Sequence, residues 1–138
     1  MSANQSHLIF IKSLVSFLGM LFGWYIGKID SLVYILLVFI TLDYLTGLLC
    51  AISQQKLSSE IGFRGIFRKM LILILVGVAH LLDSVLLPAG ASLRTAVIFF
   101  YLSNEGISLL ENAGQLGIPI PNKLKAILSQ LSEKNKNH

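Results

Sequence analysis

The chain has 138 residues, of which 54% are hydrophobic and only 13% are charged. Soluble domains carry about 25% charged residues because their surfaces must be wetted. This composition therefore excludes an ordinary water-soluble globule and leaves no room for a separate soluble enzyme domain. The net charge is +4, but the basic residues lie between apolar runs, without the interleaved aromatics of a nucleic-acid interface. We predict one all-α integral membrane domain over residues 1–138, whose basic residues face anionic lipid and bind no nucleic acid.

Four apolar stretches are candidate membrane-spanning helices, because about 20 apolar residues at 1.5 Å each cross the hydrocarbon. The first, 8–27, has Lys12 near its start and Trp24 near its end as interfacial anchors. It lacks the basic region that precedes the core of a cleavable signal peptide, so we expect it to be retained. The second, 31–53, is the strongest, since thirteen Leu, Ile, Val or Phe residues outweigh Asp43.

The remaining candidates are less uniform. The third stretch, 70–87, is equally apolar and is followed by Pro88. The fourth, 95–112, is marginal because Glu105 and neighbouring polar residues cancel most of the free energy of inserting its eight strongly apolar side chains. It spans only if these polar groups find partners. Beyond it, the apolar spacing over 122–133 predicts an amphipathic tail helix on the membrane surface.

The connections favour four spans with both termini in the cytoplasm. Arg64, Arg68 and Lys69 make the connection after the second stretch basic, which marks it as cytoplasmic. The tail after Pro121 is also rich in lysine, and the other two connections are nearly neutral. With three spans, one basic region would lie on the wrong side unless the first stretch is peripheral.

Glycines recur at two places. Gly19, Gly23 and Gly27 repeat every fourth residue and so share one face of the first helix. Small residues let helices approach closely in lipid, so we predict helix packing there, either within the chain or between copies. Glycines also punctuate 62–69, which we expect to be a basic turn that sets the topology or contacts lipid or a partner.

Four ionisable residues lie at membrane depth: Asp43, His80, Asp83 and Glu105. A carboxylate there costs about 2.5–3.5 kcal/mol on insertion scales, so such groups face a bundle interior or a water-filled cavity. Two hypotheses follow: these residues line an aqueous lesion, or they form buried hydrogen-bonded pairs that hold the bundle together. His80 and Asp83 are i, i+3 neighbours and could pair with each other.

An enzyme is not expected. The sequence contains no phosphate-binding loop, no metal-ligand spacing and no motif that places a nucleophile beside a base. Cys50 is the only cysteine, so it can form neither an intramolecular disulfide nor a cysteine metal site. We therefore predict no catalytic residues, no metal and no cofactor.

The most distinctive motifs lie in three stretches: LDYLTG at 42–47, SSEIGFRGIFRKMLILILVGVAHLLD at 58–83 and LRTAVIFFYLSNEGISLLENAGQLGIPIP at 93–121. Together they resemble the phage-lysis and toxin-secretion holin family of Gram-positive phages, prophages and clostridial toxin loci. The resemblance covers roughly residues 31–131.

This resemblance implies a small protein that oligomerises into lesions in the bacterial cytoplasmic membrane. The lesions release a murein hydrolase to the cell wall or help a toxin to escape. Members of the family often have three spans, which leaves three and four open. The alternative is an antiholin or another non-lytic membrane assembly protein. A small-solute transporter would show two related halves, and no internal repeat is present.

Overall fold

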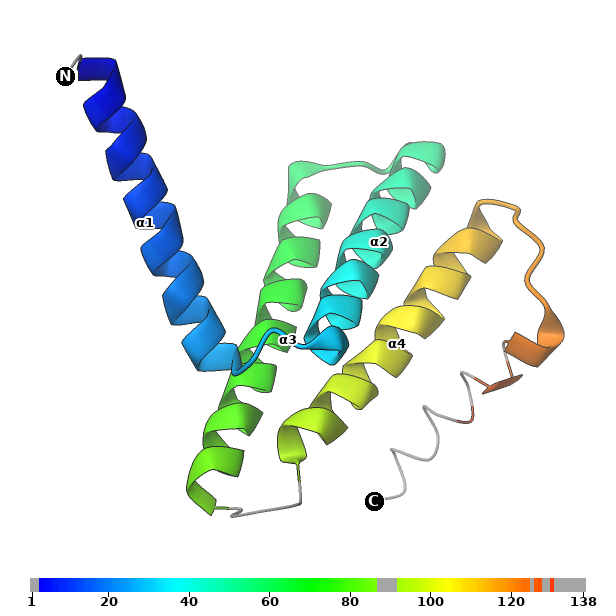
Figure 1. The fold of residues 1–138 in the computed structure, drawn as a ribbon. Helices are drawn as coiled ribbons and strands as arrows, with labels where there is room; N and C mark the ends of the chain where they lie inside the picture. Colours follow the sequence, from blue (N-terminus) through cyan, green and yellow to red (C-terminus); the bar gives the residue numbers. More distant parts are fainter. Residues whose placement is uncertain (1–2, 87–91, 125, 128–129, 131–138) are drawn as a thin grey trace.

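The computed structural model describes residues 3–86, 92–124, 126–127 and 130, and within these residues the chain is helical, without strands (Figure 1). The long helices are α1 (Ala3–Ile26), α2 (Ser31–Ser53), α3 (Ser59–Leu86) and α4 (Leu93–Gln115). The prediction of an all-α membrane fold is confirmed. Among the described residues, α1, α2 and α3 are long and apolar enough to cross a membrane, by length and composition.

Helices α2, α3 and α4 form an antiparallel bundle, and α1 diverges from it (Figure 1). Among the described helices, α1 packs only against α3, near its own C-terminal end. The start of α1, the α2–α3 connection and the end of α4 all lie at one end of the molecule (Figure 1). We call this the 54–58 end, after the connection, and the opposite one the 27–30 end.

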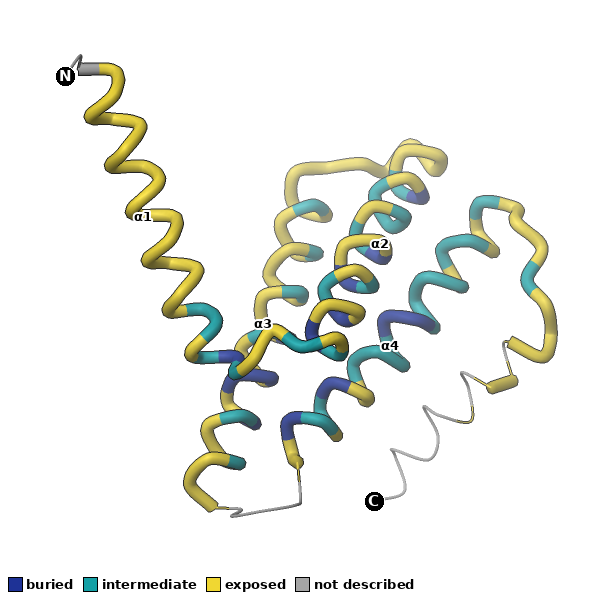
Figure 2. The backbone as a smooth tube through the Cα atoms, in the orientation of Figure 1, coloured by how far each residue is buried: buried dark blue, intermediate teal, exposed yellow. Residues whose placement is uncertain are grey.

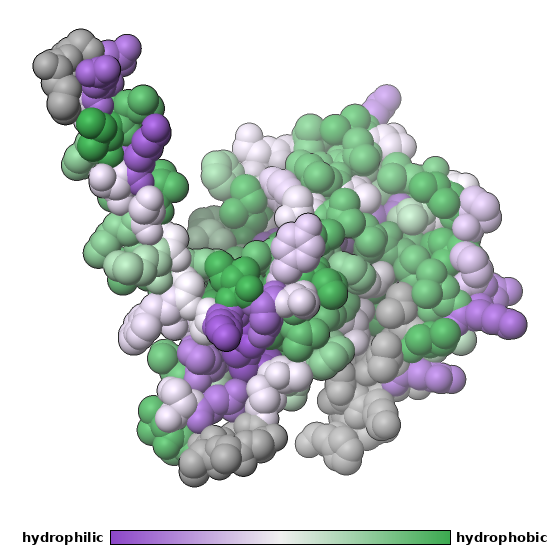
Figure 3. All heavy atoms as spheres, in the orientation of Figure 1, coloured by the Kyte–Doolittle hydropathy of each residue, from purple (hydrophilic) through white to green (hydrophobic). Residues whose placement is uncertain are grey.

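The buried core joins α2, α3 and α4 to the last residue of α1. Its fully or nearly fully buried members are Ile26, Val33, Leu36, Ile40, Ile72, Val76 and Ile98. Most of α1 and the outer faces of the bundle are exposed (Figure 2). Apolar side chains cover most of the visible surface, and polar ones gather where α1 meets the bundle (Figure 3). Such a surface suits lipid, where exposed apolar side chains carry no penalty.

The helix ends follow from local chemistry. Asp30 caps α2, since its Oδ1 accepts a hydrogen bond from the backbone N–H of Val33 at 3.0 Å. Ser92 caps α4 in the same way through the N–H of Thr95 at 3.1 Å. Gly27 follows α1 with φ of +87°, a left-handed conformation that a residue with a Cβ rarely adopts.

The expectation of a turn over 62–69 is wrong, because α3 runs without a break from Ser59 to Leu86. The side chain of Ser58 accepts a hydrogen bond from the N–H of Ile61 at 3.3 Å, and so supports the first turn. Glu60 and Arg64 form an i, i+4 ion pair at 2.9 Å on the surface. The basic segment is therefore the first part of the third helix.

The two glycines of this segment serve helix packing. Both Gly62 and Gly65 lie against Tyr44 of α2, and a Cβ on Gly65 would lie 3.1 Å from Cε2 of that ring. The glycines let α2 and α3 approach each other, and since α3 stays helical there, they do not mark a turn.

The other bounds differ modestly from those expected. Helix α2 occupies the range 31–53, whereas α1 begins at Ala3 and α4 extends the range 95–112 at both ends. In the tail, 122–124 and 126–127 are helical. Residues 125, 128–129 and 131–138 lie outside the described residues, so the amphipathic helix over 122–133 remains a prediction.

Candidate functional site

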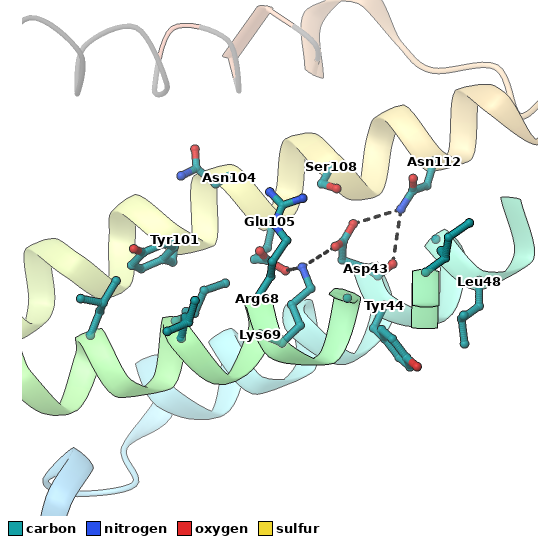
Figure 4. Close-up of a pocket in the computed structure, with 16 residues that line it drawn as sticks. Asp43, Tyr44, Leu48, Arg68, Lys69, Tyr101, Asn104, Glu105, Ser108 and Asn112 are labelled. Carbon is teal, nitrogen blue, oxygen red and sulfur yellow. Dashed lines mark hydrogen bonds and ion pairs between the residues drawn. The ribbon is translucent and has the colours of Figure 1, made fainter. Parts of the chain in front are cut away.

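The most unusual polar feature is an ion cluster at the centre of the bundle, formed by Asp43, Lys69 and Glu105 (Figure 4). Nζ of Lys69 in α3 lies 2.5 Å from Oδ2 of Asp43 in α2, and it also pairs with Oε2 of Glu105 in α4. The exposed fractions of these side chains are 17% for Lys69, 9% for Asp43 and 7% for Glu105. The ion cluster is thus a buried bridge between three helices, with two negative charges and one positive charge.

A side-chain amide completes the coordination of Asp43. Nδ2 of Asn112 donates to Oδ1 of Asp43 and to Oγ1 of Thr46, both at 3.0 Å. Both carboxylate oxygens of Asp43 therefore have a partner. Among the described residues, no buried side-chain nitrogen or oxygen lacks a hydrogen bond. This satisfaction of polar groups is what makes the ion cluster tolerable inside an apolar bundle.

A cavity of about 490 Å³ adjoins the ion cluster, between α2, α3 and α4. Its walls include the polar side chains of Tyr44, Arg68, Asn104 and Ser108 (Figure 4). The cavity is large enough and polar enough to hold several water molecules. Within the described part of the chain, no group of His, Cys, Asp and Glu side chains could hold a metal ion. The arrangement is suited to hydration and charge pairing, and it has no nucleophile–base pair for catalysis.

The structure brings together only two of the four ionisable residues singled out in the sequence, Asp43 and Glu105. Their partner, Lys69, had been assigned to a topology-setting turn. A sequence signal for it does exist. Once the segment is read as helix, Lys69 lies three and seven residues before the buried Ile72 and Val76, on the same inward face. Arg64, by contrast, lies on the surface with Glu60.

Asp83 and His80 lie at the 27–30 end and have separate roles. The carboxylate of Asp83 accepts hydrogen bonds from the N–H groups of Leu93 at 2.7 Å and Arg94 at 2.9 Å. It therefore caps the start of α4. The imidazole of His80 lies against Gly27, where a Cβ would be 2.8 Å from its Nδ1. No hydrogen bond joins His80 to Asp83 among the described residues.

Arg94 is a structural residue that the sequence analysis missed. Its guanidinium donates to the carbonyl oxygens of Ile26 at 2.8 Å and Lys28 at 2.6 Å, and to Oδ2 of Asp30 at 2.8 Å. It thereby ties the end of α1 and the start of α2 to α4. The hydrogen bond from Arg94 holds the pKa of Asp30 below its usual value, although partial burial opposes the shift.

The predicted glycine face of α1 does not pack within the chain. Neither Gly19 nor Gly23 has a heavy atom within 4 Å of the position that a Cβ would take. The close approach between α1 and α3 occurs instead at Gly77, directly beneath the ring of Tyr25. The hydroxyl of Tyr25 donates to the carbonyl oxygen of Ile74 at 2.7 Å, which fixes the ring in place.

Comparisons with known proteins place this geometry in context. A family model described as bacteriophage holin family matches residues 20–133. An uncharacterized protein of Clostridium perfringens is 48% identical over 93% of this chain and 95% of its own length. An uncharacterized protein of Listeria monocytogenes is 46% identical over 80% and 78%, respectively. A probable holin of Bacillus phage phi105 is 37% identical over 63% of this chain and 64% of its own length. No solved structure matches.

Proposed function

The chain belongs to the bacteriophage holin family, and we propose that it acts as a holin. It accumulates in the bacterial cytoplasmic membrane, assembles with copies of itself, and opens lesions in that membrane. A murein hydrolase, or a toxin, leaves the cytoplasm through these lesions. The protein acts without catalysis and without a cofactor.

The ion cluster is the observation that carries this proposal. Asp43 lies 12 residues after the start of α2 at Ser31, and Glu105 lies 12 residues after the start of α4 at Leu93. At 1.5 Å per residue, both are about 18 Å from the 27–30 end, near the middle of a hydrocarbon layer of about 30 Å. A simple membrane anchor has no use for charges at this depth, since they make insertion less favourable.

The same cluster supplies a physical route from a closed form to a lesion. In the monomer, Lys69 binds both carboxylates, so lipid meets only apolar side chains. In a crowded assembly, separation of α4 from α2 and α3 would turn Asp43, Lys69 and Glu105 toward water. Their hydration then offsets the lost ion pairs, and the same residues line the lesion. The open faces of Gly19 and Gly23 on α1 leave room for a helix of a neighbouring copy.

Inducible expression in a bacterium tests the function directly. Growth, membrane potential and the amount of inserted protein are followed together. A holin produces an abrupt depolarisation after a delay, and a co-expressed cytoplasmic murein hydrolase then lyses the cell. Sustained growth and a stable membrane potential at full insertion would contradict the proposal and indicate a non-lytic antiholin.

A further inference from the structure

A second cavity continues the first along the line where α3 and α4 meet. It has a volume of about 370 Å³ and is lined by residues of these two helices alone, among them Leu82, Ala96 and Phe100. Leu75 and Tyr101 line both cavities. The two cavities are therefore neighbouring parts of one groove, which we call the α3–α4 groove.

The groove changes from polar to apolar along its length. Toward the 54–58 end its walls include Arg68, Asn104 and Ser108. Toward the 27–30 end, beyond Tyr101, its lining contains no charged side chain. Fourteen residues separate Arg68 from Leu82, or about 21 Å of helix. This length exceeds the roughly 15 Å of hydrocarbon in one leaflet, so the groove can receive an acyl chain along its full extent.

Arg68 supplies a positive charge at the polar part of the groove. Among the described residues, Lys69 is engaged by the two carboxylates of the ion cluster and Arg64 by Glu60. Arg68 takes part in none of the ion pairs of the described residues. Its side chain is exposed and lines the groove beside α4 (Figure 4). A phosphate placed there would meet an uncommitted guanidinium, a group that binds phosphate with two parallel hydrogen bonds.

From this gradient and this charge, we propose that the α3–α4 groove is a binding site for an anionic phospholipid. The phosphate lies at Arg68, Tyr101 lies beside the upper part of the tail, and one acyl chain lies between Leu75 and Leu82. The lipid belongs to the leaflet next to the 54–58 end. A helix from another copy is too large for the site, because a segment 10 Å wide and 21 Å long fills about 1,600 Å³. The proposal does not depend on lesion formation.

The test is lipid binding to the full chain in a mild detergent, followed by native mass spectrometry. The probes are phosphatidylglycerol and phosphatidylcholine with identical acyl chains. The unsubstituted protein is expected to bind phosphatidylglycerol more tightly. Arg68→Gln should weaken that binding about tenfold, because a charge-assisted hydrogen bond is lost. Arg64→Gln, on the same helix but outside the groove, is the matched control and should retain the preference.

A second pair of variants tests the apolar part. Ala96→Leu fills the groove from an exposed position, so it should weaken the binding of both lipids without disturbing the core. Val85→Phe adds bulk to an exposed site outside the groove and should leave binding unchanged. Helix content by circular dichroism verifies that each variant is folded.

Three outcomes would overturn the proposal. The first is equal binding of the two lipids by the unsubstituted protein, and the second is an equal loss in the two arginine variants, which would indicate diffuse electrostatic attraction. The third is full competition by inorganic phosphate alone, which would reveal a site for a free anion. None of these results bears on depolarisation in cells, so failure here is separate from failure of the holin proposal.

Discussion

Lys69 of α3 lies 2.5 Å from Asp43 of α2, and its ammonium group also binds Glu105 of α4. One cation therefore holds two carboxylates that are 62 residues apart in the sequence (105 minus 43). Charges in such a buried arrangement depend on one another, because removal of one partner leaves the others without compensation in a medium of low dielectric constant. The stability of the bundle and the hydration of a lesion are thus linked through the same three side chains.

We predict that Lys69→Met destabilises the bundle strongly. The variant leaves two buried carboxylates without their cation, and the loss in the free energy of unfolding should be about 3–5 kcal/mol. Unfolding by a denaturing detergent in mixed micelles, followed by circular dichroism, measures it. Arg64→Met removes a surface pair whose side chains are 74% and 79% exposed, so its effect should be near zero. Equal effects of the two substitutions would rule out the bridging role of Lys69.

Neutralising the whole ion cluster should separate stability from function. In the triple variant Asp43→Asn, Lys69→Met and Glu105→Gln, no uncompensated charge remains, so the free energy of unfolding should recover most of the loss seen with Lys69→Met. The charges that favour a hydrated lesion are also gone. We therefore expect inserted protein that depolarises the membrane much later than the unsubstituted chain, or not at all. Unchanged timing at equal expression would show that the ion cluster does not line the lesion.

Asp83 had been grouped with these residues on the basis of depth, and the structure gives it another role. Its hydrogen bonds to the first N–H groups of α4 are local capping contacts, and a contact across a connection cannot be inferred from helical spacing. Lys69 was missed for a related reason. Glycine and basic residues in 62–69 are typical of a turn, but packing against Tyr44 keeps the segment helical.

Helix α2 was predicted within its observed bounds because an Asp cap precedes an uninterrupted apolar run. The partners of α4 were foreseen only in kind. Its polar residues had to find partners at membrane depth, and Glu105 and Asn112 do so on Lys69 and Asp43. Which partners they chose depends on the tertiary packing of α2 and α3, which residue periodicity alone does not contain.

We predict that Gly77→Ala detaches the end of α1 from α3. A Cβ at this position would overlap the ring of Tyr25, so the ring must leave and its hydrogen bond to Ile74 is lost. The expected cost is about 1–3 kcal/mol. Spin labels at Phe17 and Val85, in a Cys50→Ala background, should show a broader distance distribution. Gly23→Ala, which has open space around it, should leave the distribution unchanged; a broadening in both variants would point to general loosening of α1.

Acid should weaken the 27–30 end through Asp30. Its pKa in the folded protein is lowered, chiefly by the hydrogen bond from Arg94, relative to an ordinary value of 3.8. The stability that this carboxylate contributes is therefore fully present above pH 3.8 and is lost as the pH falls through the lower, folded-state value. Unfolding measured between pH 7 and pH 2 should show this loss in the unsubstituted chain. Asp30→Asn should be less stable at pH 7 and flatter in this acid range; an identical acid profile would exclude the pair as its source.

The position of α4 decides the topology and gives the last prediction. Its sequence is less apolar than that of the other helices, yet Glu105 and Asn112 are turned toward α2 and α3, so its outward face can meet lipid. If α4 spans, its end lies on the same side as the α2–α3 connection, as the bundle arranges them (Figure 1). Single cysteines at Ser58 and at Ile118, in a Cys50→Ala background, should then both resist an impermeant thiol reagent in intact cells. Both should react in inverted vesicles. Labelling of the Ile118 cysteine alone in intact cells would place α4 on the membrane surface and leave three spans.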